Sequence, residues 1–306
     1  IRSEREIQFI NQNFDFADRL NSKRDFLAYF KQQMIKRNKS KGNYDNWYGT
    51  YKYLLLYTRG KCTFGQVDEK FCEGFKTFLA TVRSRKSEHS RLSENTKYTY
   101  FNKFRACVRD AFMEKLFAVN PILRVKGVPQ GESHREFLTL EELKAVYQTE
   151  CEHPVLKRAA IFSALSGRRW SDMIKLTWKE VQHSEMDGYF IRFTQQKTKG
   201  AETLHIPDQA FEQMREREDD NERVFKGLKY SAHTNLQLAR WIMKAGITKK
   251  ITFHCFRHTY ATLQLTLGTD IYTVSKLLGH RHLKTTEIYT KVIDKKKIEA
   301  AGRIKL

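Results

Sequence analysis

The sequence predicts a mainly α-helical protein, built from an N-terminal helical bundle and a mixed α/β domain with a small antiparallel sheet. Three observations predict this class. Apolar residues recur at helical spacing through most of the chain. One pair of strand-like runs interrupts the second half, and a stretch rich in Gly, Pro and Ser separates the two halves. A length of 306 residues fits two domains of ordinary size.

The first half contains four apolar stripes at helical spacing, which is typical of a compact bundle. The stripes are Phe26, Phe30 and Met34; Trp47, Tyr51, Leu54 and Leu55; Val67, Phe71, Phe75, Phe78, Leu79 and Val82; and Phe101, Phe104, Val108, Phe112 and Leu116. Polar residues that can cap helices precede two of them, the pair Asn21–Ser22 and Asp68, and we expect the fourth helix to begin near Ser93. We expect Asn120–Pro121 to end the fourth helix, because proline cannot continue one.

Residues 124–136 (RVKGVPQGESHRE) hold few apolar side chains and read as an interdomain linker. Thr139 and Glu142 then form a capping box that starts a new helix. Two short runs, YFIRFT and TLHIP, flank the segment QQKTKG and predict a hairpin. We expect the other elements of this half to be helices, near 140–149, 154–165, 171–177, 208–216, 231–245, 253–267, 270–278 and 287–299.

Charge is the strongest signal in the composition. Lys and Arg number 56 against 35 Asp and Glu, a net charge of +21, and the first 130 residues hold 26 of the former and 13 of the latter. Such a field favours a polyanionic partner, most commonly nucleic acid, although ribosome-associated and membrane-surface proteins share it. Two clusters favour phosphate contact over a merely solvated face. They are Lys31, Lys36, Arg37, Lys39 and Lys41, and Arg83, Arg85, Lys86 and Arg91.

The five cysteines show no CxxC spacing, which argues against a zinc ribbon or a disulfide framework. We interpret them as small buried side chains in a protein of a reducing cytosol. No run approaches the roughly 18 consecutive apolar residues of a membrane helix, and no signal peptide is recognisable. Because the chain begins with Ile1, we expect further residues upstream.

The second half carries an ordered series of residues suited to phosphodiester chemistry. The series is Arg168 and Arg169 in SGRRW, Lys197 and Lys199 in the hairpin, His254, Arg257 and His258 in HCFRH, His280 in LGH, and Tyr289 in TTEIYT. Arginine can clasp two phosphate oxygens at once, and a lysine or histidine can protonate a leaving oxygen. A tyrosine hydroxyl has an ordinary pKa of about 10 and needs an electropositive site to act as a nucleophile. A metal nuclease would instead need clustered carboxylates.

Taken singly, these residues have plainer readings. Tyr289 alone would be an amphipathic core residue. His254 and His258, one helical turn apart, could hold zinc together with His280 or His282, although no Glu or Cys ligand lies near them. We expect His258 to pack structurally behind Arg257. The plain readings do not predict the whole series in its order.

The ordered segments SGRRWSDMIKLTW, QKTKG, HCFRHTYAT, LLGH and TTEIYT resemble the tyrosine recombinase (phage integrase) family, especially integrases of bacterial conjugative transposons and related mobile elements. The resemblance covers roughly residues 20–300. It implies a core-DNA-binding, SAM-like helical domain over 1–123, a linker over 124–136 and a catalytic domain over 137–306.

The resemblance also implies a role for each catalytic position. Arg169 is similar to the first catalytic arginine, and His254 and Arg257 to the HxxR pair. Lys197 is similar to the hairpin lysine that protonates the leaving 5′ oxygen. His280 matches the position after LG, and Tyr289 the nucleophile that forms a 3′-phosphotyrosyl link.

Two positions depart from this pattern. Arg168 stands where the family usually has an apolar residue, so a shift of one residue would give Arg168 the catalytic role. Arg169 is preferred on the geometry needed at the phosphate. Lys199 competes with Lys197, which fits the QKT context better.

The implied activity is site-specific recombination of double-stranded DNA at attachment sites, for integration or excision of a mobile element. The resemblance implies no metal or other cofactor, and ATP is not needed because the covalent link conserves the bond. The resemblance further implies a homotetramer on DNA, accessory DNA-bending or directionality proteins, no membrane partner, and a cytoplasmic, nucleoid-associated location. A nicking-closing topoisomerase, a non-catalytic DNA-binding regulator and a metal-dependent nuclease remain rival readings.

Overall fold

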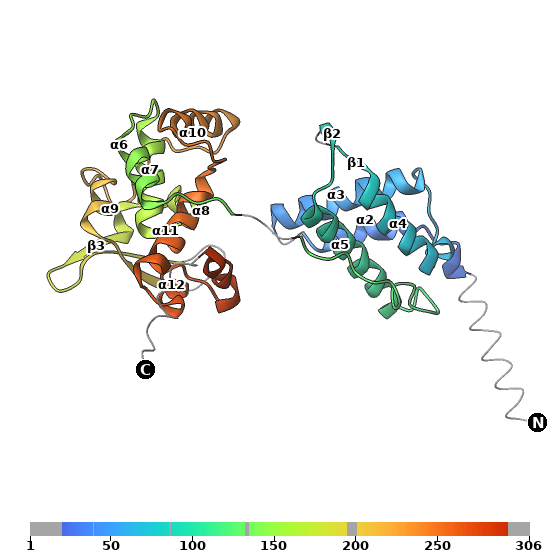
Figure 1. Cartoon of the computed structure of the whole chain (residues 1–306). Coiled ribbons are helices and arrows are strands. Elements are labelled where there is room, and N and C mark those ends of the chain that lie inside the picture. Colours follow the sequence, from blue (N-terminus) through green and yellow to red (C-terminus); the bar gives the residue numbers. More distant parts are fainter. Residues whose placement is uncertain (1–19, 39, 86, 132–134, 195–200, 293–306) are drawn as a thin grey trace, which may run out of the picture. The chain divides into compact units, whose positions relative to one another are not determined.

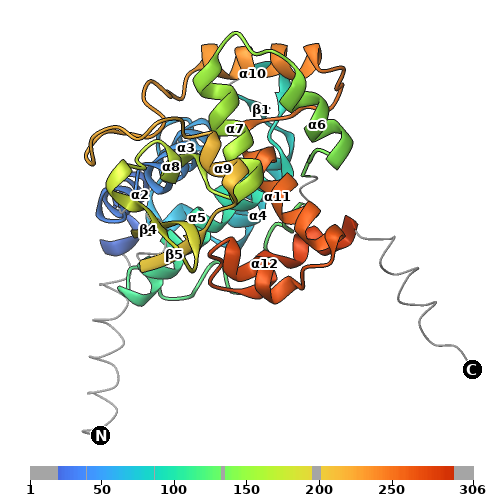
Figure 2. The same cartoon turned by 90° about the vertical axis from the view of Figure 1, so that its left-hand side faces the viewer.

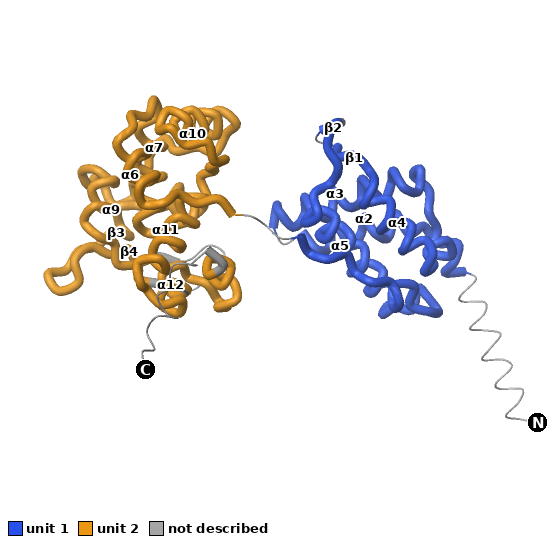
Figure 3. The backbone as a smooth tube through the Cα atoms, viewed as in Figure 1, with its two compact units in different colours: residues 1–133 blue, residues 134–306 orange. Residues whose placement is uncertain are grey.

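A computed structural model describes residues 20–38, 40–85, 87–131, 135–194 and 201–292. The chain divides into two compact units, residues 1–133 and 134–306 (Figure 3). Helices predominate and the sheets are small and antiparallel, which confirms the predicted fold class (Figure 1). Among the described residues, no helix has the length and apolar character needed to cross a membrane.

The first unit is a helical bundle around an aromatic core. Its elements are α2 (Phe26–Lys36), α3 (Lys41–Thr58), the 3-10 turn η1 (Phe64–Gln66), α4 (Glu69–Thr81), β1 (Arg83–Ser84), β2 (Ser87–Arg91) and α5 (Glu94–Met113). Phe26, Phe30, Phe75 and Phe104 are fully buried in the core. Most residues of the four predicted apolar stripes therefore fall on the four helices, on the faces that the bundle buries, whereas Val67, Val82 and Leu116 lie just beyond helix ends.

Several boundaries in this unit differ from the prediction. The side chain of Asp25 caps α2 by accepting from the backbone N–H groups of Leu27 and Ala28, so the expected cap at Asn21–Ser22 was wrong. Helix α5 ends at Met113, before the predicted stop, and Lys115 beyond it has a left-handed backbone with φ 59°. The cap predicted at Asp68 is confirmed, and α5 begins near Ser93 as expected, with the Ser93 side chain as its cap.

The hairpin β1–β2 was not predicted, because its sequence has no apolar alternation. It is held to α3 by Tyr53, whose buried hydroxyl donates to the carbonyl of Arg83 at 3.3 Å. The same hydroxyl accepts from the backbone N–H of Arg85 at 2.9 Å. These contacts leave Arg83, Arg85 and Arg91 exposed to solvent.

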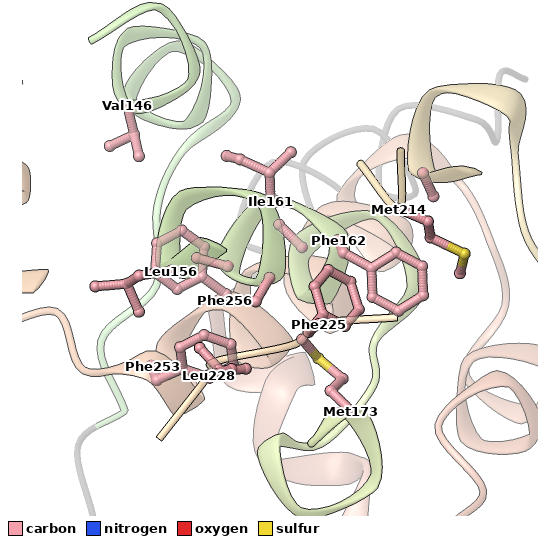
Figure 4. Packing of buried hydrophobic residues seen from close by; sticks show 14 of the residues in the cluster. Val146, Leu156, Ile161, Phe162, Met173, Met214, Phe225, Leu228, Phe253 and Phe256 are labelled. Atoms are coloured by element: carbon pink, nitrogen blue, oxygen red, sulfur yellow. The ribbon is translucent and has the colours of Figure 1, made fainter. Parts of the chain in front are cut away.

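The second unit surrounds one large apolar cluster with helices and a three-stranded sheet. Its elements are α6 (Leu140–Gln148), α7 (Pro154–Ser166), α8 (Trp170–Met173), η2 (Trp178–Glu180), β3 (Val181–Ser184), β4 (Gly188–Thr194), β5 (Ala201–His205), α9 (Asp208–Glu212), α10 (Ala232–Lys244), α11 (Phe253–Leu267), α12 (Ile271–Leu277), η3 (Leu283–Thr285) and η4 (Glu287–Val292). Helices α7 and α11 lie side by side in its middle, with α10 and α12 at opposite ends (Figures 1 and 2). Phe162, Phe225 and Phe256 fill the space between these elements (Figure 4).

The sheet has the order β3-β4-β5, and the predicted hairpin forms its second and third strands. Val181 pairs with Ile191, which pairs with Leu204, so these three buried side chains form one row on the core face. Strand β3 was not predicted, because its sequence VQHS carries a single strongly apolar residue.

The helix predictions in this unit hold except at three places, one of which is the helix expected near 208–216, which ends at Glu212. The helix expected near 171–177 is the four-residue α8, followed by a turn. The segment expected as a helix over 287–299 is 3-10 as far as Val292, and its remainder lies outside the described residues. The capping box of Thr139 and Glu142 is confirmed. All five cysteines are buried and unpaired with one another, as interpreted from their spacing.

Candidate active site

Arg257 is the centre of the site. It lies in the second turn of α11 and is only 4% exposed. Its guanidinium donates to the backbone carbonyl of Gly167 and, at 2.7 Å, to that of Leu278, and it lies 3.1 Å from Nε2 of His280. Burial foremost, and repulsion from Arg169, lower the pKa of Arg257 to about 9, which leaves it charged at neutral pH. One guanidinium therefore ties together the ends of α7 and α12.

Gly167 makes this arrangement possible. It ends α7 in a left-handed conformation with φ 67°, which turns its carbonyl toward Arg257. A Cβ at this position would lie 2.6 Å from the ring of Tyr260 and 3.0 Å from Leu278. Both the backbone conformation and the space thus require glycine here.

His280 is fixed by hydrogen bonds on both ring nitrogens. Nε2 faces Arg257, which can only donate, so Nε2 must be the acceptor. Nδ1 lies 2.8 Å from the hydroxyl of the fully buried Thr286 and therefore carries the proton. Burial, followed by the charges of Arg257, Arg169 and Arg135, lowers the pKa of His280 to about 4. The imidazole is consequently neutral at physiological pH.

Tyr289 lies on η4 and is only 4% exposed. Its ring packs in an apolar cluster with residues of α11 and α12, among them Ala261, Leu265 and Val274. Its hydroxyl lies 2.8 Å from Nδ1 of His258. Burial raises the pKa of Tyr289, and the positive charges of Arg257, Arg135 and Arg169 oppose that rise. The phenol is therefore protonated, and it lies within the field of the arginines.

The two candidate arginines before α8 differ in their surroundings. Arg168 is 6% exposed, and its carbonyl accepts a hydrogen bond from Ser163 at 2.9 Å. Arg169 caps α8, and its Nη1 lies 3.8 Å from a carboxylate oxygen of Asp172.

The charge of Arg169 lowers the pKa of Arg257, His280 and Tyr289 alike. The charge of Arg168 affects only Arg257 among these three groups, and it is the smallest of the effects there. The surroundings thus favour Arg169, although both arginines are near the centre of the site.

The structure says less about the remaining predicted residues, His254 and the two hairpin lysines. His254 is exposed on α11, one turn before His258, and their rings meet edge to face at 4.5 Å. Lys197 and its rival Lys199 lie outside the described residues, between strands β4 and β5.

Two further residues reach the hydroxyl of Tyr289, and neither was predicted to do so. His258 was expected only to pack behind Arg257. Arg135, assigned to the linker, opposes the rise in the pKa of Tyr289 and contributes to the field at His258 and His280. No motif marks either contact, because each joins segments that are far apart in the sequence.

The site therefore combines a buried phenol with guanidinium groups from three segments of one unit. Arg135 precedes α6, Arg169 begins α8 and Arg257 lies on α11. Guanidinium groups bind phosphate oxygens bidentately and stabilise the charge that develops as a phosphodiester is attacked. A hydroxyl nucleophile within such a field is suited to phosphoryl transfer.

The comparisons with known proteins agree with this geometry. A family model described as the phage integrase SAM-like domain matches residues 25–126, and one described as the phage integrase family matches residues 136–296. A tyrosine recombinase of Thermosipho africanus is 27% identical over 193 residues, which is 60% of this chain and 67% of the relative. Tyrosine recombinase XerC of Listeria monocytogenes is 51% identical over 55 residues, only 18% of each chain.

Solved structures show the same fold. A lambda integrase dimer bound to a core site has a TM-score of 0.68 at 15% identity, and covers 86% of this chain and 93% of that chain. The Tn1549 transposon integrase in complex with transposon end DNA has a TM-score of 0.67 at 14% identity, and covers 90% and 98%. Because the second family model spans more than half of the 306 residues, the chain belongs to the phage integrase family, whose members include the tyrosine recombinases.

Proposed function

We propose that this chain cleaves and rejoins double-stranded DNA at specific sites through a covalent 3′-phosphotyrosyl link to Tyr289. The observation that carries the proposal is the position of the Tyr289 hydroxyl, which lies 2.8 Å from His258 and within the fields of Arg257 and Arg169. Membership of a family of DNA recombinases supports it.

In the proposed reaction, Arg169, Arg257 and His254 hold the scissile phosphate, and His280 acts through its contact with Arg257. The phenolic oxygen of Tyr289 loses its proton to solvent and attacks phosphorus, and the bond from phosphorus to the 5′ oxygen breaks. Lys197 gives a proton to that leaving oxygen. A 5′ hydroxyl of the partner duplex later attacks the phosphotyrosine, restores a phosphodiester and releases the tyrosine. One bond is exchanged for another at each step, so ATP is not required.

The proposal assigns DNA binding to both parts of the chain. Residues 1–123 would bind the core site through their basic clusters, 124–136 would link the parts, and 137–306 would hold the chemistry. The exposed Arg85 and Arg91 on the β1–β2 hairpin and the net charge of +21 support phosphate contact.

The wider setting is also a proposal. The substrates would be the attachment sites of a mobile element, and integration or excision would need four copies of the chain on DNA together with accessory DNA-bending or directionality proteins. The DNA-bound integrases and recombinases among the structures of similar fold support the DNA substrate of this proposal. The location would be the cytoplasm, at the nucleoid.

The test starts from a random-sequence library of nicked duplexes. The nick lets the cleaved strand diffuse away, so that a covalent adduct accumulates. Adducts are recovered under denaturing conditions and sequenced. We expect the wild-type chain to enrich a defined duplex and Tyr289→Phe to recover none, while Tyr289→Phe still binds the enriched duplex. Recovery of an adduct with Tyr289→Phe, or of none with the wild type, would contradict the proposal.

Two controls separate the rival functions. Adduct formation that survives EDTA argues against a metal-dependent nuclease. Relaxation of supercoiled DNA without sequence preference would instead favour a topoisomerase-like enzyme.

A further inference from the structure

We propose that His258 positions the nucleophile, by accepting the O–H of Tyr289 on Nδ1 and so directing the phenolic oxygen toward the scissile phosphate. The inference rests on the proposed function, because it assigns a role within that reaction. It adds a seventh residue to the six that the motifs predict.

The geometry is that of a directed hydrogen bond within a rigid frame. Nδ1 of His258 lies 2.8 Å from the Tyr289 hydroxyl, and the two ring centroids are 5.5 Å apart. The two residues are 6% and 4% exposed, so water does not readily replace either partner. His258 directly follows Arg257 on α11, and one helix therefore places both the phosphate-binding guanidinium and the group that holds the nucleophile.

The charge state of His258 suits this role. Burial foremost, followed by repulsion between a protonated His258 and its neighbours His254, Arg135 and Arg257, lowers its pKa to about 3. The ring is neutral at physiological pH and offers one acceptor nitrogen. A phenol whose pKa is raised keeps its proton and donates it, so the contact runs from the Tyr289 O–H to Nδ1, with Nε2 carrying the ring proton.

This bond controls the direction of the oxygen lone pairs. A phenolic O–H rotates about the C–O bond unless a partner fixes it. While the O–H of Tyr289 donates to His258, the lone pairs of the phenolic oxygen point away from His258. They are therefore free to attack the phosphorus of the scissile phosphate. Misdirection of a reacting group costs about 10²-fold in rate. The neutral ring is a weak base, so the role is orientation of the hydroxyl rather than storage of its proton.

The substitutions that test this role are His258→Phe and His258→Asn. Phenylalanine fills the space of the ring without an acceptor, whereas the amide oxygen of asparagine can occupy the place of Nδ1. With the enriched duplex, we expect the single-turnover cleavage rate of His258→Phe to fall about 10²-fold. We expect His258→Asn to recover most of that loss, with DNA affinity unchanged in both. Tyr260→Phe, which removes the hydroxyl of another buried tyrosine of α11, is the matched control and should cleave normally.

A second substrate separates positioning from leaving-group chemistry. A sulfur atom in place of the bridging 5′ oxygen leaves without a proton, so it should rescue a Lys197→Ala variant and leave the defect of His258→Phe in place. Cleavage by His258→Phe at the wild-type rate or faster would overturn the inference. That result is expected if the hydrogen bond merely holds Tyr289 in an inactive position, because its loss would then not slow the reaction. Cleavage by a folded His258→Asn that is as slow as His258→Phe would overturn it too.

A measurement on the DNA-free protein keeps the test independent of how the variants fold. In ¹⁵N NMR spectra, His258 should show a protonated Nε2 and a hydrogen-bonded, unprotonated Nδ1, and the Nδ1 signal should move in Tyr289→Phe. An unmoved signal would contradict the inference. Failure of the wild type to cleave any duplex would contradict the proposed function instead, so the two failures are distinguishable.

Discussion

Arg257 shows how the chemistry and the stability of the site depend on the same side chain. Its guanidinium donates to two backbone carbonyls, those of Gly167 and Leu278, and also faces His280. A planar group with five donors can satisfy these acceptors while keeping a charged face for a phosphate, which lysine cannot do. At the scale of single residues, the site is a set of hydrogen bonds that fixes positive charges around one hydroxyl.

The choice between the two adjacent arginines gives a first prediction. Arg169→Lys should lower the single-turnover cleavage rate by about 10²–10³-fold, because it removes bidentate contact to the developing charge. Arg168→Lys should change the rate only a few-fold, since Arg168 affects Tyr289 and His280 less. The comparison is made on the enriched duplex with equal DNA occupancy. A larger loss for Arg168→Lys would transfer the catalytic role to it.

The neutral histidines predict how stability depends on pH. The folded pKa of His258, about 3, lies below its ordinary value of 6.5, so the unfolded chain binds the extra proton as the pH falls. The stabilisation from a neutral His258 is complete above pH 6.5 and is lost progressively toward pH 3. The unfolding free energy should decline in that range by at most about 1.4 kcal/mol per pH unit from this residue.

Urea unfolding between pH 4 and 7 measures this slope. The unfolding free energy of His258→Phe should decline less steeply with falling pH than that of the wild type. Phenylalanine does not titrate, so the unfolded variant no longer binds the extra proton that unfolded wild type binds at His258. Parallel pH curves for the two proteins would show that His258 is not buried in its neutral form.

At the scale of elements, the sequence predicts what has a strong period or an explicit cap. Helix α11 follows its apolar pattern over the predicted range, the side chains of Asp68 and Thr139 cap helices as expected, and α5 begins near Ser93 as expected. The β1–β2 hairpin escapes prediction because its residues are polar and its stability comes from Tyr53, on another element. Propensity does not record a contact of that kind.

The same distinction applies to the site. Motif order indicates Arg257, His280 and Tyr289, and the structure brings these three together. Arg135 and His258 act on Tyr289 because α11, η4 and the segment before α6 pack together. The spacing of residues in the sequence does not predict that packing.

The prediction at the scale of elements concerns DNA binding by the β1–β2 hairpin. Arg85→Ala combined with Arg91→Ala should weaken binding to a random duplex and reduce the slope of log affinity against log salt by about 2, if each arginine contacts one phosphate. The matched control is Arg217→Ala combined with Lys226→Ala. It removes the same charge from side chains that already pair with Asp220 and Glu222. Equal effects of the two double variants would show that only net charge matters.

At the scale of the whole molecule, the chain is two compact units with a strongly basic composition. If the units together engage six to ten phosphates, affinity for duplex DNA should fall by about 10³–10⁵ between 50 and 200 mM salt. Fluorescence anisotropy with a labelled duplex measures this fall. An affinity that hardly changes over this range would contradict DNA binding through both units.

The basic tail supplies a prediction about assembly. We propose that residues 296–306, which lie outside the described residues, dock on a neighbouring copy during strand exchange. A chain that lacks them should still form the covalent adduct on one duplex but recombine two duplexes more slowly. Recombination by the shortened chain at the full rate would exclude this role.

The central claim, that Tyr289 is the nucleophile, is tested most directly by locating the bond to DNA. The adduct formed on the enriched duplex is digested with nuclease and trypsin, and the modified peptide is sequenced by mass spectrometry. We predict a nucleotide joined through its 3′ phosphate to the tryptic peptide TTEIYTK, at Tyr289. A nucleotide joined to any other residue, or through a 5′ phosphate, would contradict the account.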